Sequence, residues 1–188
     1  FLRDVTLFHV AGRALTVVTA LACMPVMWLI MKRLQVDRRF GYVALLVFCL
    51  SPLIARYSSV IRGDVYQMFF NLLGLWFSLR ALDQKNFLRD MAIAGACVGF
   101  ALSNKYPGVI GAVPVIGAAL ILFVRKQVPF KRAAIALLIA GAASLVATFI
   151  TAPFLFLNFQ GVLGGLAAEG RPSHLGQTST GLGFALQF

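Results

Sequence analysis

Two short polar stretches interrupt an otherwise apolar chain, and they hold the side chains best suited to do chemistry. The first covers residues 51–64 (SPLIARYSSVIRGD) and the second covers residues 103–108 (SNKYPG). A surplus of positive charge suits a phosphate or pyrophosphate, because its several oxygens accept charge-assisted hydrogen bonds from arginine and lysine. We therefore expect an anion site built from three cations and one orienting carboxylate: Arg56, Arg62, Lys105 and Asp64.

Each of these four residues also has a plain structural explanation. Arg56 and Arg62 could anchor helix ends at lipid headgroups. Lys105 could be a turn residue, and Asp64 could simply favour the N-terminus of a helix. A charge at membrane depth costs about 3 kcal/mol on insertion scales and is usually paired or marks a substrate path. Asp64 is the nearest acidic candidate to pair with Arg62 or Lys105.

The composition indicates the kind of element that must position these residues. The chain is 60% hydrophobic and only 12% charged, with a mean hydropathy of +0.88, whereas a soluble domain carries about 25% charge. We therefore predict an all-α fold, a polytopic membrane helical bundle. The net charge of +11 falls in clusters between apolar runs, which is a topology signal rather than a nucleic-acid footprint. No nucleic-acid partner is expected.

The apolar runs predict about six transmembrane helices and the start of a seventh, some of them short or kinked, in one transmembrane domain over residues 1–188. Pro52 should kink the second helix. The apolar stretch 91–124 is too long for one span at about 1.5 Å per residue, so we divide it at Lys105. Gly95 and Gly99 form a GxxxG pattern that favours close helix packing. The predicted spans are 9–31, 40–60, 64–82, 91–104, 107–124 and 133–158, followed by an outer loop over 159–180 and a further span from about 181.

The distribution of basic residues predicts the orientation. Residues 32–39, 80–90 and 125–132 contain eleven of the seventeen lysines and arginines, and the positive-inside rule places such loops in the cytoplasm. The opposite side then receives Arg13, which could also snorkel to the interface, and His174. It also receives the cations of the expected anion site, which is therefore extracytoplasmic.

The common signatures of soluble enzymes and metal sites are missing from the sequence. It contains no P-loop, HExxH, GxSxG or GxGxxG pattern. The three cysteines lie inside apolar runs without metal-ligand spacing, and only two histidines exist. We expect no metal site within these residues.

Several blocks of the sequence resemble the lipid-linked glycosyltransferases of the GT-C superfamily, the protein O-mannosyltransferase and aminoarabinose-transferase relatives. The run GRALTVVTALACMPVMWLIMKRL is similar to the span that follows their first outer loop. The run SPLIARYSSVIRGDVYQMFFNLLGLWFSLRAL is similar to their next block, in which an Asp opens a helix. AIAGACVGFALSNKYPGVIGAVPV resembles their block with a basic residue, here Lys105, and APFLFLNF followed by a loop with His174 fits their step to an outer loop.

The resemblance implies an integral protein of a bacterial-type inner or plasma membrane. It would transfer a sugar, with inversion, from a polyprenyl-phosphate donor to a protein, lipid or glycan on the extracytoplasmic side. The lipid phosphate would be held by Arg56, Arg62, Lys105 and His174, supported by Asp64, Tyr106 and Arg13.

In these relatives the catalytic carboxylate lies in the first outer loop, upstream of the block that matches residues 10–34. We therefore expect no catalytic residue in this chain. No cofactor is certain, and a divalent metal would need ligands from elsewhere in a complete enzyme. Because the chain starts at Phe1 and stops at Phe188 inside an apolar run, we expect a piece of a longer protein that is inactive alone.

Two other functions remain open at this point. A secondary transporter or flippase with an anion or lipid-phosphate site would also use broken helices and basic residues. A membrane scaffold would carry the same charges as scattered headgroup anchors. Inverted halves would favour the transporter, and an upstream acidic pair in an outer loop would favour the glycosyltransferase.

Overall fold

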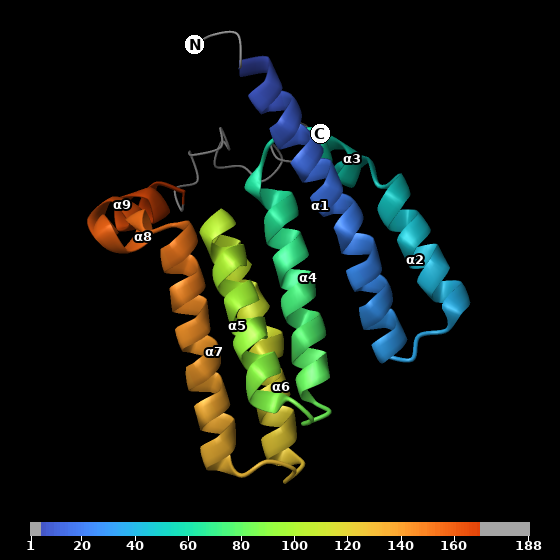
Figure 1. The fold of residues 1–188 in the computed structure, drawn as a ribbon, viewed down its shortest axis with the longest axis vertical. Helices are drawn as coiled ribbons and strands as arrows, with labels where there is room; N and C mark the ends of the chain where they lie inside the picture. The colour runs from blue at the N-terminus through green and yellow to red at the C-terminus, as the bar shows by residue number, and fades with distance from the viewer. Residues whose placement is uncertain (1–4, 170–188) are drawn as a thin grey trace, which may run out of the picture. The chain divides into compact units, whose positions relative to one another are not determined.

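The computed structural model describes residues 5–169, which form helices joined by short loops, with no strand among them (Figure 1). The chain divides into two compact units, residues 1–151 and 152–188. The helices of the first unit are α1 (Val5–Arg33), α2 (Arg38–Leu50), α3 (Pro52–Ser58), α4 (Gly63–Ala81), α5 (Phe87–Asn104), the 3-10 helix η2 (Tyr106–Gly111), α6 (Ala112–Val124) and α7 (Phe130–Thr151). The second unit contains α8 (Phe154–Leu157) and α9 (Phe159–Glu169). The predicted all-α class is confirmed for this part of the chain.

The long helices of the first unit alternate in direction, so that its loops collect at two ends (Figure 1). The basic loops after α1, α4 and α6 lie at one end, and the breaks between α3 and α4 and between α5 and η2 lie at the other. This is the arrangement that the positive-inside rule requires. The side of the membrane that each end faces stays a prediction.

Three segments of the described chain are long and apolar enough to cross a membrane: Leu7–Arg33, Tyr106–Val124 and Phe130–Thr151. The pair α2 and α3 would add a fourth, bent by 54° at the break before Pro52. The kink predicted at Pro52 is therefore confirmed, because proline has no N–H for the helix ladder. The count of six spans plus a seventh stays a prediction.

The C-terminal boundaries differ from those expected. The sixth span was expected to run to residue 158, but α7 ends at Thr151, because Pro153 cannot donate the next helical hydrogen bond. Residues 159–169 belong to the expected outer loop, whose helical or coil character the sequence does not decide, and they form α9. The Asn158 side chain accepts a hydrogen bond from the Gly161 N–H at 3.2 Å in the manner of an N-cap. The rest of the expected loop and the span from about 181 lie outside the described residues.

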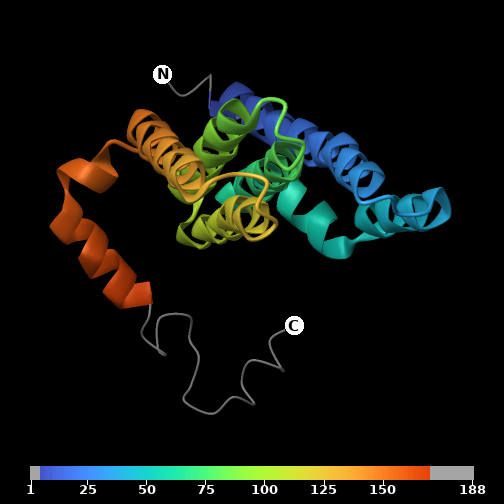
Figure 2. The same ribbon diagram turned by 90° about the horizontal axis from the view of Figure 1, so that it is seen from below.

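Helix α5 packs between α4 and α7 (Figures 1 and 2). A Cβ on Gly95 would collide with the backbone of Ala140, and one on Gly99 would collide with the backbone of Ser144. The Thr148 hydroxyl also donates to the Gly99 carbonyl at 3.2 Å. The predicted GxxxG pattern is thus a close contact between α5 and α7, of the kind that small residues permit in membranes.

An ion pair ties α4 to α5 near the loop that joins them. The Arg80 Nη2 lies 2.8 Å from Asp90 Oδ1, and its Nε donates to Asp90 Oδ2 at 3.1 Å. The Arg80 guanidinium also lies 5.3 Å above the Trp76 ring. Asp90 is only 2% exposed, so removing Arg80 would leave an uncompensated buried carboxylate.

Candidate anion-binding site

The two polar breaks meet at one end of the first unit. Lys105 Nζ lies 2.5 Å from Asp64 Oδ1, and Arg62 Nε lies 3.7 Å from Asp64 Oδ2. The three side chains stay open to the surroundings, with Asp64 28%, Lys105 49% and Arg62 54% exposed. Asp64 was predicted to pair with Arg62 or Lys105, and the structure shows contacts with both. We call Arg62, Asp64 and Lys105 the anion cluster.

The start of α4 positions Asp64. Arg62 is extended, with φ −139° and ψ 150°, and α4 begins at the next residue, Gly63. Asp64 then lies in the first turn, where a negative charge is favoured by the helix dipole. A Cβ added at Gly63 would lie 2.6 Å from the carbonyl oxygen of Asn104. The glycine therefore lets the start of α4 approach the end of α5, which brings Asp64 to Lys105.

The break after α5 positions Lys105. Its backbone is extended, with φ −162° and ψ 138°, and Tyr106 is disfavoured in an α-helix because it precedes Pro107. The Lys105 carbonyl accepts a hydrogen bond from the Gly108 N–H at 2.8 Å. A Cβ at Gly108 would collide with the backbone of Ala101, so this glycine allows η2 to fold back onto α5. Lys105 is left at the corner between two apolar helices.

The anion cluster holds two cations and one carboxylate, which leaves one positive charge for a ligand. Exposed ion pairs stabilise a fold by only about 0–1 kcal/mol, so this cluster contributes more to the position of the cations than to stability. The Arg62 guanidinium also lies 5.4 Å from the centre of the Tyr57 ring, which orients it through a cation–π contact. Sequence reasoning missed Tyr57, whose signal is an aromatic residue five positions before an arginine in the same polar break.

Four other predicted site residues are not brought into the cluster. Arg56 lies exposed on α3 and Arg13 lies exposed on α1, and neither forms an ion pair with another described residue. Tyr106 follows Lys105 at the start of η2 and is half-buried. His174 lies outside the described residues, so its role stays a prediction.

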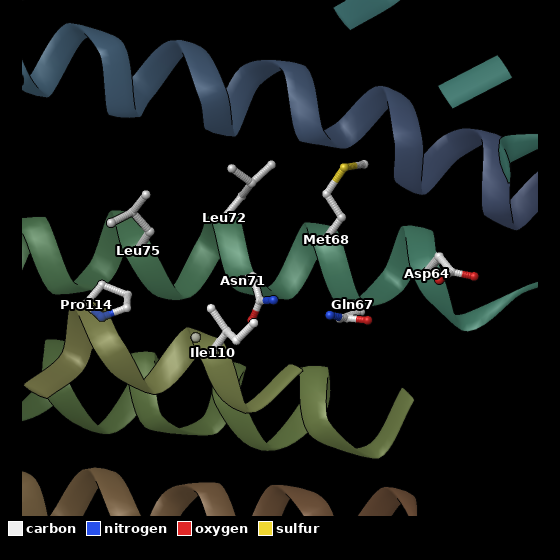
Figure 3. A pocket seen from close by; sticks show the side chains of 9 residues that line it. Asp64, Gln67, Met68, Asn71, Leu72, Leu75, Ile110 and Pro114 are labelled. Atoms are coloured by element: carbon white, nitrogen blue, oxygen red, sulfur yellow. The ribbon is translucent and has the colours of Figure 1, made fainter. Parts of the chain in front are cut away.

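A cleft of about 490 Å³ extends from Asp64 along α4 (Figure 3). Its volume falls within the roughly 300–1,000 Å³ typical of ligand sites. Gln67 and Asn71 supply polar groups three and seven positions after Asp64 on the same face of α4. Sequence reasoning missed both residues, although their helical spacing from Asp64 was visible. The remaining lining is Met68, Leu72, Leu75, Ile110, Gly111 and Pro114.

Metal ligands do not gather in the part of the chain that the structure describes. Among residues 5–169, no three or more side chains of His, Cys, Asp or Glu lie together in a way that could hold an ion. The described site offers electrostatic groups: two cations, one carboxylate and an adjoining cleft with amide groups. Such an arrangement can bind an anion and stabilise negative charge that develops on it.

Comparison with protein families shows a match over most of the chain. The family model described as dolichyl-phosphate-mannose-protein mannosyltransferase matches residues 5–165. No curated protein and no solved structure matches the chain. The matched range includes the anion cluster, both polar breaks and the cleft along α4.

Proposed function

Because the chain belongs to the dolichyl-phosphate-mannose-protein mannosyltransferase family, a family of GT-C membrane glycosyltransferases, we propose that its anion cluster binds the phosphate of a polyprenyl-phosphate-linked sugar. The contact between Lys105 and Asp64, with Arg62 beside them, is the observation that supports this proposal most. It gathers cations from two distant polar breaks next to a cleft. A phosphate placed there would accept hydrogen bonds from both cations.

The proposed chemistry is the transfer of the glycosyl group to an acceptor. A hydroxyl of a protein, lipid or glycan attacks the anomeric carbon of the sugar, with inversion, and the bond from that carbon to the phosphate oxygen breaks. The electron pair of that bond stays on the phosphate, so the polyprenyl phosphate leaves with one more negative charge. Arg62 and Lys105 stabilise that charge as it develops, which is an electrostatic contribution to the rate. The proton of the acceptor hydroxyl passes to a general base.

The proposed active side is extracytoplasmic. The anion cluster and the basic loops lie at opposite ends of the first unit (Figure 1). If the basic loops face the cytoplasm, as the positive-inside rule favours, the cluster faces the other compartment. The lipid tail of the donor would then remain in the bilayer while its phosphate reaches the membrane surface.

The test is the donor kinetics of Lys105→Gln in the complete protein. A charge-assisted hydrogen bond contributes about 1.5–3 kcal/mol, so we expect kcat/KM for the polyprenyl-phosphate sugar to fall about 10- to 150-fold. Lys85→Gln is the matched control, because Lys85 is exposed in the loop between α4 and α5. Donor kinetics of Lys105→Gln that equal those of the control would refute the phosphate site.

A further inference from the structure

Helix α4 carries two carboxamides, on Gln67 and Asn71, that the phosphate chemistry does not use. Both line the cleft that begins at Asp64 (Figure 3). Neither side chain forms a hydrogen bond with another residue of the described range, and the Asn71 Oδ1 is buried without a donor. A buried amide without a partner costs free energy, so a ligand that supplies the missing hydrogen bond would be favoured here.

The spacing of these carboxamides places them below the anion cluster. Gln67 follows Asp64 by three residues and Asn71 follows it by seven. At 1.5 Å per residue, Asn71 lies about 10 Å along the α4 axis from Asp64. In Figure 3, Gln67 and Asn71 leave α4 toward Ile110, whereas Met68 and Leu72 leave it on the other side. The two carboxamides therefore form a polar wall inside the cleft.

The helix η2, which faces the two carboxamides, leaves space for the Asn71 side chain at Gly111. A Cβ added at Gly111 would collide with the Asn71 Oδ1, so the glycine admits the amide between α4 and η2. The oxygen and nitrogen of an asparagine exchange places by a rotation about χ2, so either one can face Gly111 while the other faces the cleft. Each carboxamide can donate two hydrogen bonds and accept two. The wall thus offers donors and acceptors together.

A ligand that matches this wall must both donate and accept hydrogen bonds. A prenyl or acyl chain does neither, and a phosphate mainly accepts. Hydroxyl groups do both. We propose that the cleft takes the hydroxyl-bearing glycosyl group of the lipid-linked donor, with Gln67 and Asn71 hydrogen-bonded to its hydroxyls while its phosphate lies at Arg62 and Lys105. This inference rests on the proposed function and adds where the sugar is recognised.

The experiment separates the sugar from the phosphate with two ligands and the complete protein. One ligand is the glycosylated polyprenyl phosphate, measured by its KM. The other is bare polyprenyl phosphate, measured as a competitive inhibitor by its Ki. For Asn71→Leu we expect the KM of the glycosylated donor to rise about tenfold or more, while the Ki of bare polyprenyl phosphate stays within twofold. For Lys105→Gln we expect both constants to rise.

Each other outcome would refute either this inference or the proposed function. If Asn71→Leu leaves the KM unchanged while Lys105→Gln raises both constants, the amides hold only water, so the inference fails and the proposed function stands. If Asn71→Leu raises KM and Ki equally, Asn71 has a structural role and the inference is wrong. If Lys105→Gln changes neither constant, the proposed function itself is wrong.

The unfolding midpoint of Asn71→Leu distinguishes a ligand-binding role of Asn71 from a structural role. Because Asn71 loses no hydrogen bond within the described residues, Asn71→Leu should raise the unfolding midpoint of the donor-free protein in detergent. A fall in that midpoint would show a structural role and overturn the inference. Gln67→Met tests the second carboxamide with the same two measurements, the KM of the glycosylated donor and the Ki of bare polyprenyl phosphate. Leu120→Met is the control, because Leu120 is exposed on α6 and does not line the cleft, so KM and Ki should stay unchanged.

Discussion

Gly63→Ala tests whether the anion cluster forms because position 63 has no side chain, which lets the start of α4 approach the end of α5. The Cβ of alanine would lie 2.6 Å from the carbonyl oxygen of Asn104 and 3.3 Å from its carbonyl carbon. Backbone atoms cannot rotate away as the tip of a side chain can. The start of α4 must therefore move from the end of α5 by about 0.8 Å to regain an ordinary contact of 3.4 Å.

The size of that movement predicts two effects. The Lys105 Nζ to Asp64 Oδ1 distance, 2.5 Å in the protein, would open to about 3.3 Å, which is longer than a charge-assisted hydrogen bond. Overpacking of this kind costs about 1–3 kcal/mol of unfolding free energy. We therefore expect Gly63→Ala to lower the unfolding midpoint and to raise the KM for the polyprenyl-phosphate donor.

The assay compares thermal unfolding in detergent with that of Gly141→Ala. Gly141 lies within α7 with nothing within 4 Å of an added Cβ, so alanine there should stabilise the helix by about 0.5–1 kcal/mol. The two alanine variants should thus shift the midpoint in opposite directions. If Gly63→Ala is as stable as Gly141→Ala and keeps its donor KM, the explanation for the position of Asp64 is wrong.

Two further predictions concern the frame of the first unit. Gly99→Leu should destabilise the protein by more than the roughly 1–3 kcal/mol of ordinary overpacking. The reason is that the leucine side chain would collide with the α7 backbone at Ser144. A near-wild-type unfolding midpoint would contradict the close contact between α5 and α7. Arg80→Ala should cost about 3–5 kcal/mol of unfolding free energy, because it leaves the Asp90 side chain, which is 3% exposed, without its cationic partner. Asp83→Ala should cost about 1 kcal/mol or less, because Asp83 pairs with Arg33 while 47% exposed, so equal losses in these two variants would contradict the assignment.

The contact between Asp64 and Lys105 could be predicted from charge alone. A lone carboxylate and nearby cations at the ends of apolar runs have few other ways to avoid an unpaired charge near a bilayer. The same argument placed Arg56 in the site, but α3 carries Arg56 without bringing it to an ion pair with a described residue. Charge balance indicates which residues must find partners, and the backbone decides which of them reach one.

The carboxamides could not be found by counting charges, because Gln67 and Asn71 are neutral and lie in a run that otherwise predicts a membrane helix. Their meaning depends on facing η2 across a cleft, and the position of η2 depends on the break at Lys105 and on Gly108. Local backbone signals were more reliable. Pro52 predicted the bend because proline lacks an N–H, whereas the early end of α7 before Pro153 follows from the same rule but was not anticipated.

The most direct test of the account is which side of the membrane the anion cluster faces. Single cysteines would replace Asn104, an exposed residue beside Lys105, and Lys131, exposed at the start of α7, after Cys23, Cys49 and Cys97 have been changed to alanine. A maleimide that cannot cross membranes is then added to intact cells that express the complete protein. We predict labelling at position 104 in intact cells and at position 131 only after permeabilisation. Labelling of both positions from the same compartment would contradict the account.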